Sequence, residues 1–413
     1  MRHLVAAALC ATLVLPAQRP STFRCANVLA EDGASWRTDQ VVVVIGFTIL
    51  EVRPAVAGEP VDVDFGATFL IPGLIDLHTH VCLRPYDELP WDRQVLEESL
   101  ELRSMRAVAH ARATLAAGFV AIRDLGTEGA GFADVALRQA IRDRIAVGPR
   151  LFASTKAIVA TGCYGPNLPV VDAPKGAQVA DGPDGVRKAV REQVAAGAQW
   201  IKVYADYRRA PGQPATPTFT LAELQALCDE AKTAGVPVAA HATTDAGIAR
   251  AVEAGVRTIE HGAGASEPTL RRMAERGVVL CPCLAANEAI LRYAGHQGPN
   301  VERLNAARVG FQRALAAGVT IACGSDAGVF AHGDNAREIE LMVEFGMSPA
   351  QAIAAATSVA AKVLGGIETG RLEKGNTFGF VVLDGDPLRD IASLRRVRAV
   401  VLDESGDVLS RER

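Results

Sequence analysis

Short apolar runs alternate regularly with longer helical stretches from residue 70 onward, and this alternation limits the fold more than any other feature of the sequence. The runs have the length of strands, and the segments between them are alanine-rich with helical spacing. Strands that are buried on both faces of a parallel sheet read as such continuous apolar runs. The alternation therefore predicts repeated strand–helix units. The strands are expected within residues 74–80, 119–126, 150–158, 199–206, 236–242, 256–262, 277–283 and 319–326.

Eight strand–helix units match an α/β fold of the (β/α)8 TIM-barrel type. A doubly wound open sheet is the alternative, because alternation alone does not prove that the sheet closes. The polar residues favour the barrel, since they repeatedly fall at the carboxyl ends of the predicted strands, where barrel enzymes place their chemistry. One helix is expected to begin with a capping box at Thr220 and Glu223. Several helices are expected to end at a glycine: Gly118, Gly197, Gly235, Gly255, Gly277 and Gly318.

The two ends of the chain differ from its centre. Residues 21–70 and 367–413 contain short β-like runs separated by turn residues, and we expect them to form together a small β-sandwich domain beside a barrel of residues 71–366. Residues 1–20 begin with basic residues and continue with a short apolar stretch, the pattern of a cleaved secretory signal. They predict a secreted or periplasmic protein; an apolar or disordered tail is the alternative.

The composition excludes some partners. The net charge is −4 and the pI is near 6.1, which gives no electrostatic reason to expect a nucleic acid. The apolar stretch at the N-terminus is too short to span a bilayer comfortably, so we expect no stable membrane insertion. Several of the eight cysteines lie in or beside apolar runs and read as small buried side chains. The composition is compatible with a homo-oligomer.

A pair of histidines ends the first predicted strand, in the stretch GLIDLHTH at residues 73–80. Side chains two residues apart on a strand point the same way, so His78 and His80 would form half of a metal site. Taken singly, a strand histidine is usually a satisfied core residue and a strand lysine usually extends to solvent. Further candidates nevertheless fall at the ends of other predicted strands: Lys202, His241, His261 and Asp326.

The order and spacing of these motifs resemble the amidohydrolase superfamily, and within it the binuclear-metal members similar to imidazolonepropionase-like hydrolases and metal-dependent prolidases. The likeness covers nearly the whole chain beyond the signal, and it implies a distorted (β/α)8 barrel. The motifs that carry it are IPGLIDLHTH, AGFVAIRDLG, WIKVY, AHA, TIEHG, CGSDAG and GRLEKGNTFGFVVLDGDPL.

The resemblance implies a centre with two divalent metal ions, for which zinc fits the nitrogen and oxygen ligands best. Lys202, carboxylated by carbon dioxide, would bridge the two ions, and burial would favour the uncharged amine that this reaction requires. Asp326 would also act as general base and then as general acid. The ligands would be His78, His80 and Asp326 for the more buried metal, and His241 and His261 for the second.

Substrate contacts are assigned from strand and loop positions. Tyr204 lies two residues beyond Lys202 and should face the same side, although packing at the barrel rim is an equal alternative. Arg84 and Tyr86 follow the first strand and could recognise a carboxylate, with a solvated loop as the alternative. His332 falls in the loop after the last strand, where either a ligand contact or a surface position fits.

These features predict a hydrolase that cleaves an amide-type C–N bond of a small-molecule substrate through a water activated between the two metals. Dipeptides of the Xaa-Pro type or N-acyl amino acids are the first expectation, and cyclic amides are the second. A barrel that has kept binding but lost catalysis is the alternative from another class. Two loops, ATGCYGPN and VYADYRRAPGQP, depart from the prolidase-like pattern and put the dipeptidase assignment in doubt.

Overall fold

The structure is a computed structural model, and it describes residues 19–46, 48–166, 174–210, 212–297, 299–365, 370–376 and 379–402. The predicted signal segment therefore lies almost entirely outside the described residues. The last part of the expected C-terminal β region, residues 403–413, lies outside them as well.

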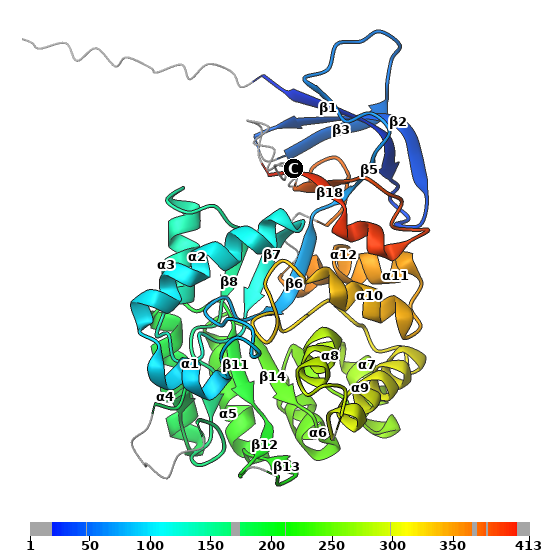
Figure 1. Ribbon diagram of the computed structural model, residues 1–413. Helices are drawn as coiled ribbons and strands as arrows, with labels where there is room; N and C mark the ends of the chain where they lie inside the picture. Colours follow the sequence, from blue (N-terminus) through cyan, green and yellow to red (C-terminus); the bar gives the residue numbers. More distant parts are fainter. Residues whose placement is uncertain are drawn as a thin grey trace, which may run out of the picture.

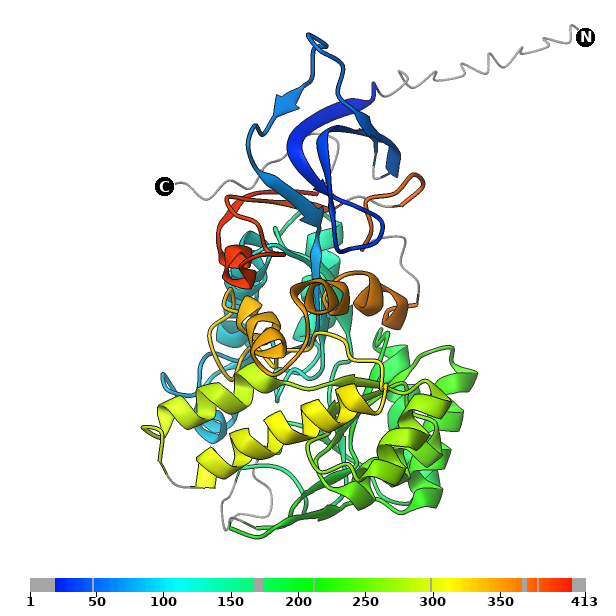
Figure 2. The ribbon, with the colours of Figure 1, turned by 90° about the vertical axis from the view of Figure 1, so that its right-hand side faces the viewer.

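Strands from both ends of the chain form one seven-stranded mixed sheet, seen at the top of Figures 1 and 2. Its order is β18-β17-β5-β1-β2-β3, with β4 paired to β1. The two ends of the chain meet in this sheet, because β17 runs antiparallel to β5. A second facing sheet is not among the ladders of these described residues, so the sandwich stays a prediction. The strands are β1 (Ser21–Leu29), β2 (Trp36–Ile45), β3 (Thr48–Pro54), β4 (Val63–Asp64), β5 (Phe69–Pro72), β17 (Phe380–Leu383) and β18 (Val397–Val401).

The central strands pair in parallel, as the apolar runs predict. One sheet contains β6 (Leu74–Thr79), β7 (Phe119–Asp124) and β8 (Arg150–Ala153). The other has the order β10-β9-β11-β14-β15-β16. Its strands are β9 (Ile158–Val159), β10 (Gln178–Val179), β11 (Ile201–Tyr204), β14 (Val238–Ala242), β15 (Thr258–His261) and β16 (Val279–Cys281).

Two predicted runs are less regular than expected. The run at 150–158 is split into β8 and β9, and Thr155 between them has a φ of 64°, which an extended strand does not accommodate. The run at 319–326 forms only isolated bridges, Leu280↔Ile321 and Thr79↔Ala327. It still connects the two sheets, because one bridge reaches the end strand β16 and the other reaches β6.

Helices between the strands surround this parallel core (Figure 1). The predicted capping box is present, with Thr220 and Glu223 at the start of α5. All six glycines expected at helix ends have positive φ values, which confirms that prediction. The helices are α1 (Trp91–Glu97), α2 (Leu100–Ala116), α3 (Ala133–Arg142), α4 (Gly182–Ala195), α5 (Leu221–Thr233), α6 (Asp245–Ala254), α7 (Glu267–Arg276), α8 (Leu284–Tyr293), α9 (Pro299–Ala316), α10 (Ala336–Glu344), α11 (Pro349–Ala355), α12 (Ser358–Val363) and the 3-10 turn η1 (Ile391–Arg395).

The cysteines of the described residues are all buried and free, as small core side chains would be. A short hairpin of β12 (Asp206–Arg208) and β13 (Ala215–Pro217) follows β11 directly. Among the described residues, no helix combines the length and the apolar character that a membrane crossing requires.

Candidate metal centre

The six predicted ligands lie together at the carboxyl ends of the parallel strands. His78 is central: its Nε2 atom is 3.4 Å from Nζ of Lys202 and 3.5 Å from Oδ1 of Asp326. Nε2 of His80 lies 3.2 Å from the same Asp326 oxygen. The ring of His261 is 5.6 Å from that of His78 and 4.6 Å from that of His241, measured between centroids. The strand ends thus bring all six side chains into one cluster.

Burial favours the neutral form of four of these groups. It lowers the pKa of His78 and His241 well below the usual histidine value, and it lowers the pKa of His261 to about 4. The nearby positive charge of Lys202 acts in the same direction on each of the three rings. Burial also lowers the pKa of Lys202, although Glu260 and Asp326 oppose this shift. Neutral imidazoles have a free lone pair, and this is the form that binds metal ions.

His80 and Asp326 form the one ionic pair of the six. Burial disfavours a charged His80, but the hydrogen bond and the negative charge of Asp326 outweigh it and raise the His80 pKa to about 9. Burial likewise opposes the Asp326 charge, yet His78 and His80 hold the pKa of this carboxyl below its usual value. The carboxylate thus attracts positive charge to the point where the two Nε2 atoms converge.

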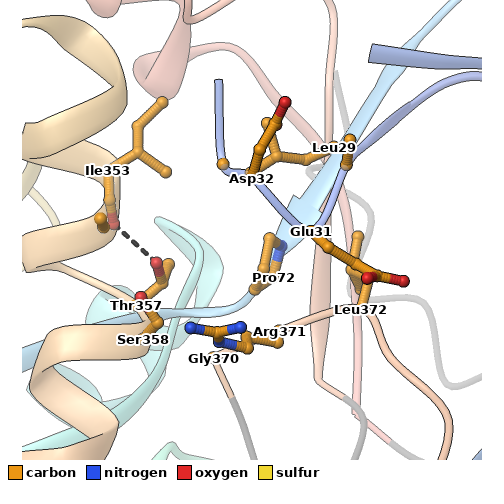
Figure 3. Close-up of a pocket in the computed structure, with 13 residues that line it drawn as sticks. Leu29, Glu31, Asp32, Pro72, Ile353, Thr357, Ser358, Gly370, Arg371 and Leu372 are labelled. Carbon is orange, nitrogen blue, oxygen red and sulfur yellow. Dashed lines mark hydrogen bonds between the residues drawn. The ribbon is translucent and has the colours of Figure 1, made fainter. Parts of the chain in front are cut away.

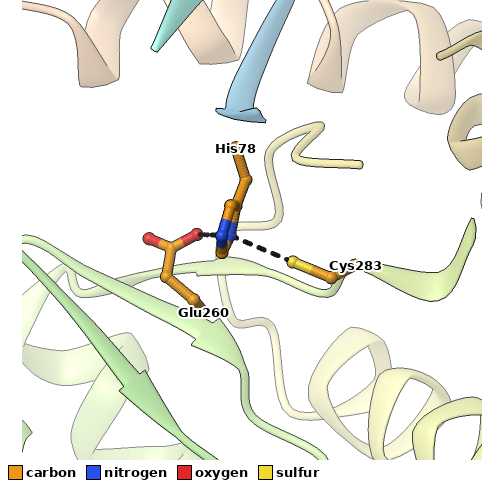
Figure 4. Close-up of side chains that lie close together, drawn as sticks. All are labelled: His78, Glu260 and Cys283. Carbon is orange, nitrogen blue, oxygen red and sulfur yellow. Dashed lines mark hydrogen bonds and ion pairs between the residues drawn. The ribbon is translucent and has the colours of Figure 1, made fainter. Parts of the chain in front are cut away.

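A buried carboxylate orients the ring of His78 (Figure 4). Oε2 of Glu260 lies 2.9 Å from Nδ1 of His78, and Oε1 of Glu260 accepts a hydrogen bond of 2.9 Å from Arg123. Glu260 also accepts one of 2.5 Å from Thr258. Sγ of Cys283 approaches the same Nδ1 atom at 3.2 Å. These contacts leave Nε2 of His78 directed toward Lys202 and Asp326.

The buried carboxylate of Asp76 connects β6 to the segment that carries Asp326. Oδ1 of Asp76 accepts hydrogen bonds from the backbone amides of His78 and Ser325, at 3.0 and 2.9 Å. Its Oδ2 accepts from the Ser325 hydroxyl and from Nδ2 of Asn335, at 2.5 and 2.7 Å. The amide of Asp326 in turn donates to the carbonyl of His78 at 2.7 Å. The two ligands are therefore held in register through their backbones.

Three residues at or just beyond the carboxyl ends of the core segments are left-handed although they are not glycine. His261, Cys283 and Asp326 have φ values of 71°, 53° and 64°. This conformation is uncommon for such residues and persists where the surrounding structure enforces it, which is typical of functional sites.

A group of aromatic side chains lies beside the ligands. Tyr204 stacks on the ring of His241 with 4.6 Å between centroids, and its hydroxyl donates to that of Tyr164 at 3.3 Å. The Tyr164 hydroxyl donates to Glu128 at 2.5 Å, and Nε1 of Trp91 donates to the same carboxylate at 2.9 Å. The side chain of Tyr204 thus points toward the ligands, which is the direction expected from its position two residues beyond Lys202.

The other expected substrate residues have protein partners. Nε2 of His332 donates to the carbonyl of His80 at 3.2 Å, and its ring stacks on that of His110. Arg84 forms an ion pair with Glu98 at 3.1 Å. Arg84 and His332 share a surface pocket of about 320 Å³, which none of the six predicted ligands lines. Their assignment as substrate residues stays a prediction.

Figure 3 shows a second pocket, of about 100 Å³. It lies between the turn that follows β1 and the region of α11 and α12, and none of the six predicted ligands lines it. Its polar lining includes Glu31, Asp32 and Arg371.

Sequence reasoning missed the charged residues that support the ligands. Asp76, Arg123 and Glu260 are fully buried. Each of them interrupts an apolar strand run, and this signal could have identified them, because a charged side chain inside a buried strand requires a partner. Asn287 and Arg303 gave no signal, since they lie on helices without a recognisable motif.

The donor set fits divalent cations. His78, His80 and Asp326 place three ligand atoms within 4.8 Å of one another, and His261, Cys283 and Asp326 do the same. Lone pairs on nitrogen and a carboxylate oxygen that converge on one point are the ligands of zinc and related metals.

Residues 69–406 match the amidohydrolase family. The chain belongs to this family. This enzyme family generally uses metal ions and acts on small molecules. Its membership in the family, together with the relatives described next, makes the chain a hydrolase of amide-type C–N bonds.

The relatives of this amidohydrolase include enzymes that cleave amides. Ochratoxinase of Aspergillus niger is 30% identical over 364 residues, which cover 80% of this chain and 73% of the relative. Among solved structures, a Xaa-Pro dipeptidase with bound methionine superposes with a TM-score of 0.85 and 28% identity, over 95% of this chain and all of the other. A prolidase complexed with N-methylphosphonate-L-proline gives a TM-score of 0.83 and 30% identity, again over 95% of this chain and all of the other.

Proposed function

We propose that this amidohydrolase is a binuclear metal-dependent enzyme that hydrolyses the amide bond of dipeptides, in particular of the Xaa-Pro type, or of N-acyl amino acids. The observation that carries the proposal is the convergence of His78, Lys202 and Asp326 on one point, with three further histidines around them. The ochratoxinase and prolidase relatives support amide cleavage in a structure of this kind.

Two divalent cations, for which we propose zinc, would be held by this cluster. One would take His78, His80 and Asp326, and the other His241 and His261. Lys202 would bridge them as a carbamate: its neutral amine forms an N–C bond with carbon dioxide and releases one proton. Burial in contact with His78 favours the neutral amine that this step needs. When bound, the cations would polarise the amide carbonyl and lower the pKa of a water molecule.

The protein's own groups would then move the proton. Asp326 stays ionised at neutral pH, because His78 and His80 lower its pKa, so its carboxylate can accept a proton from the attacking water. It would return this proton to the leaving nitrogen as the C–N bond breaks, which releases a neutral amine. His78 and His80 hold the carboxylate at 3.5 and 3.2 Å and so fix the position from which it acts.

Tyr204 would line the substrate site. It stacks on His241, and its hydroxyl belongs to a chain of hydrogen bonds that continues through Tyr164 to Glu128. Trp91 and Tyr207 also contact Tyr164 through their rings, at 5.0 and 5.1 Å between centroids. This aromatic wall would hold an apolar or planar part of the substrate beside the scissile bond.

We also propose that the parallel strands belong to a distorted (β/α)8 barrel of residues 71–366. The isolated bridges from Leu280 to Ile321 and from Thr79 to Ala327 support closure, because they connect the segment 319–326 to strands of both parallel sheets. Residues 21–70 and 367–413 would form the smaller β domain. The basic and apolar start of the chain supports export to the periplasm or the medium.

The test is hydrolysis of a substrate panel by the metal-loaded protein. Dipeptides, Xaa-Pro peptides, N-acyl amino acids and cyclic amides are incubated separately, and amine release is measured. We expect release from the Xaa-Pro peptides or the N-acyl amino acids, and none from protein stripped of metal by a chelator. Release from cyclic amides alone, or from no member of the panel, would contradict the proposed substrate class.

A further inference from the structure

A chain of contacts connects the metal centre to an arginine on α9. Sγ of Cys283 lies 3.2 Å from Nδ1 of His78, and the carbonyl of Cys283 accepts a hydrogen bond of 2.9 Å from Nδ2 of Asn287. Oδ1 of Asn287 accepts one of 2.6 Å from Nε of Arg303. Asn287 therefore fixes the guanidinium of Arg303 relative to the end of β16, one strand away from the ligand His261.

The outer half of this guanidinium is free. Among the described residues, the two Nη groups of Arg303 have no hydrogen-bond or ion-pair partner, and the side chain keeps contact with solvent. Partial enclosure by the surrounding protein nevertheless lowers its pKa, and Asp326 and Tyr207 are among the groups whose charges act on it. Arg303 is thus a solvent-exposed residue whose position is fixed by its hydrogen bond to Asn287.

The charge of Arg303 also acts on the hydroxyl of Tyr86, in the loop that follows β6. Arg208 on β12 lies on the same side, since its charge acts on both Arg303 and Tyr207. This edge of the site is therefore cationic.

We propose that Arg303 binds a carboxylate of the substrate through its two free Nη groups, with Asn287 as its positioning residue. The substrate would then be an N-acyl amino acid or a dipeptide with a free C-terminal carboxylate. A guanidinium presents parallel N–H donors that match the two oxygens of a carboxylate, whereas a neutral amide or ester offers one acceptor and no charge. Arginine stays protonated, which excludes a role as proton carrier.

This inference rests on the proposed function and deepens it, because it states which end of the substrate the protein recognises. It also differs from the expectation that Arg84 recognises a carboxylate. Arg84 is already paired with Glu98, whereas the Nη groups of Arg303 are not paired with any described residue.

The test compares an acid with its amide in matched variants of the full-length, metal-loaded protein. The substrates are the best N-acetyl amino acid of the panel and the same molecule with a carboxamide in place of the carboxylate. Arg303→Gln should lower kcat/KM for the acid by about 10- to 100-fold, mainly through KM, because a hydrogen-bonded charge pair is lost. The carboxamide should be hydrolysed equally by both proteins.

The control is Arg308→Gln, which makes the same change five residues further along the helix, on another of its faces, and should leave both substrates unaffected. Arg303→Lys keeps the charge without the paired donors and should fall between wild type and Arg303→Gln. An equal loss for acid and amide in Arg303→Gln would indicate structural damage and overturn the inference. An unchanged preference for the acid would overturn it too.

A binding measurement separates this inference from the proposed function. If the wild type hydrolyses no member of the panel, the proposed function fails. Calorimetric titration with N-acetyl-L-proline and with its carboxamide then decides the role of Arg303. Weaker binding of the acid to Arg303→Gln than to the wild type, with unchanged binding to Arg308→Gln, would support it. Equal binding of the acid to all three proteins would refute it.

Discussion

Glu260 accepts a hydrogen bond of 2.9 Å from Nδ1 of His78, on the side of the ring opposite to the metal-facing Nε2 atom. With the proton on Nδ1, the lone pair of the imidazole is on Nε2 and points toward Lys202 and Asp326. Arg123 compensates the charge of Glu260 at 2.9 Å, and both side chains are fully buried. A partner of this kind fixes the tautomer of a metal-binding histidine and increases its basicity.

Glu260→Gln should weaken metal binding although it removes no ligand. The amide is a poorer acceptor for His78, and the buried charge of Arg123 loses its compensation. We expect a loss of about 10- to 100-fold in metal affinity and a loss of stability of about 3–5 kcal/mol. Competition with a chelator measures the metal affinity, and denaturant unfolding measures the stability. Glu288→Gln, which removes a half-buried ion pair with Arg337, is the control and should leave metal affinity unchanged.

His78→Ala should lower metal content and activity together, because His78 lies at the centre of the cluster. His110→Ala is a control with the same change, since His110 is a partly buried histidine that lies on α2 and bonds to the carbonyl of Val81. Metal analysis of the purified proteins should show fewer than two metals per chain in the first variant and an unchanged content in the second. Two metals per chain in His78→Ala would remove His78 from the ligand set.

Lys202→Ala should be rescued by small acids. The substitution leaves space where the lysine carbamate would lie, and a short carboxylic acid such as acetate or propionate can supply the missing oxygens. We expect activity to be nearly lost without additive and partly restored as the acid concentration rises. The same acids should not increase the activity of the wild type. Full activity of Lys202→Ala without any acid would contradict the bridging role.

The candidate ligands could be located from the sequence alone because side chains on a β-strand point in the same direction at every second residue. His78 and His80 were therefore expected on one side, and the other strand ends were expected to meet them. The supporting groups could not be placed in the same way, since Asn287 and Arg303 reach the site from helices α8 and α9 through tertiary contacts. The run at 319–326 was expected to be a regular strand, but the backbone of Asp326 turns to a φ of 64° at its end.

Asp326→Asn should depress turnover far more than substrate affinity. The amide keeps the size of the side chain and one oxygen for a metal, but it does not accept the proton. We expect kcat to fall by about 100- to 10,000-fold with a much smaller change in KM. Steady-state kinetics on the best panel substrate, together with metal analysis, test this expectation. A rate equal to that of the wild type at full metal content would exclude Asp326 as the proton carrier.

Glu338 on α10 gives the protein a pH dependence of stability that is separate from catalysis. Its side chain is fully buried, and its Oε2 accepts a hydrogen bond of 2.7 Å from the amide of Ala285 at the start of α8. Burial raises its pKa from 4.5 to about 8, although the hydrogen bonds from α8 oppose the shift. The folded protein therefore holds a proton on Glu338 over a pH range in which the unfolded chain releases it.

The sign of the effect follows from this difference. A group whose pKa is raised on folding contributes its full stability below the unfolded pKa of 4.5, and this stability is lost as the pH rises toward 8. Glu338→Gln keeps the hydrogen bond to Ala285 but does not ionise. Relative to this variant, the wild type should lose about 3 kcal/mol of unfolding free energy between pH 5 and pH 8. Denaturant unfolding at the two pH values measures the difference. Glu344→Gln, an exposed carboxylate of the same helix region, should show no such change, and parallel pH profiles of wild type and Glu338→Gln would refute the prediction.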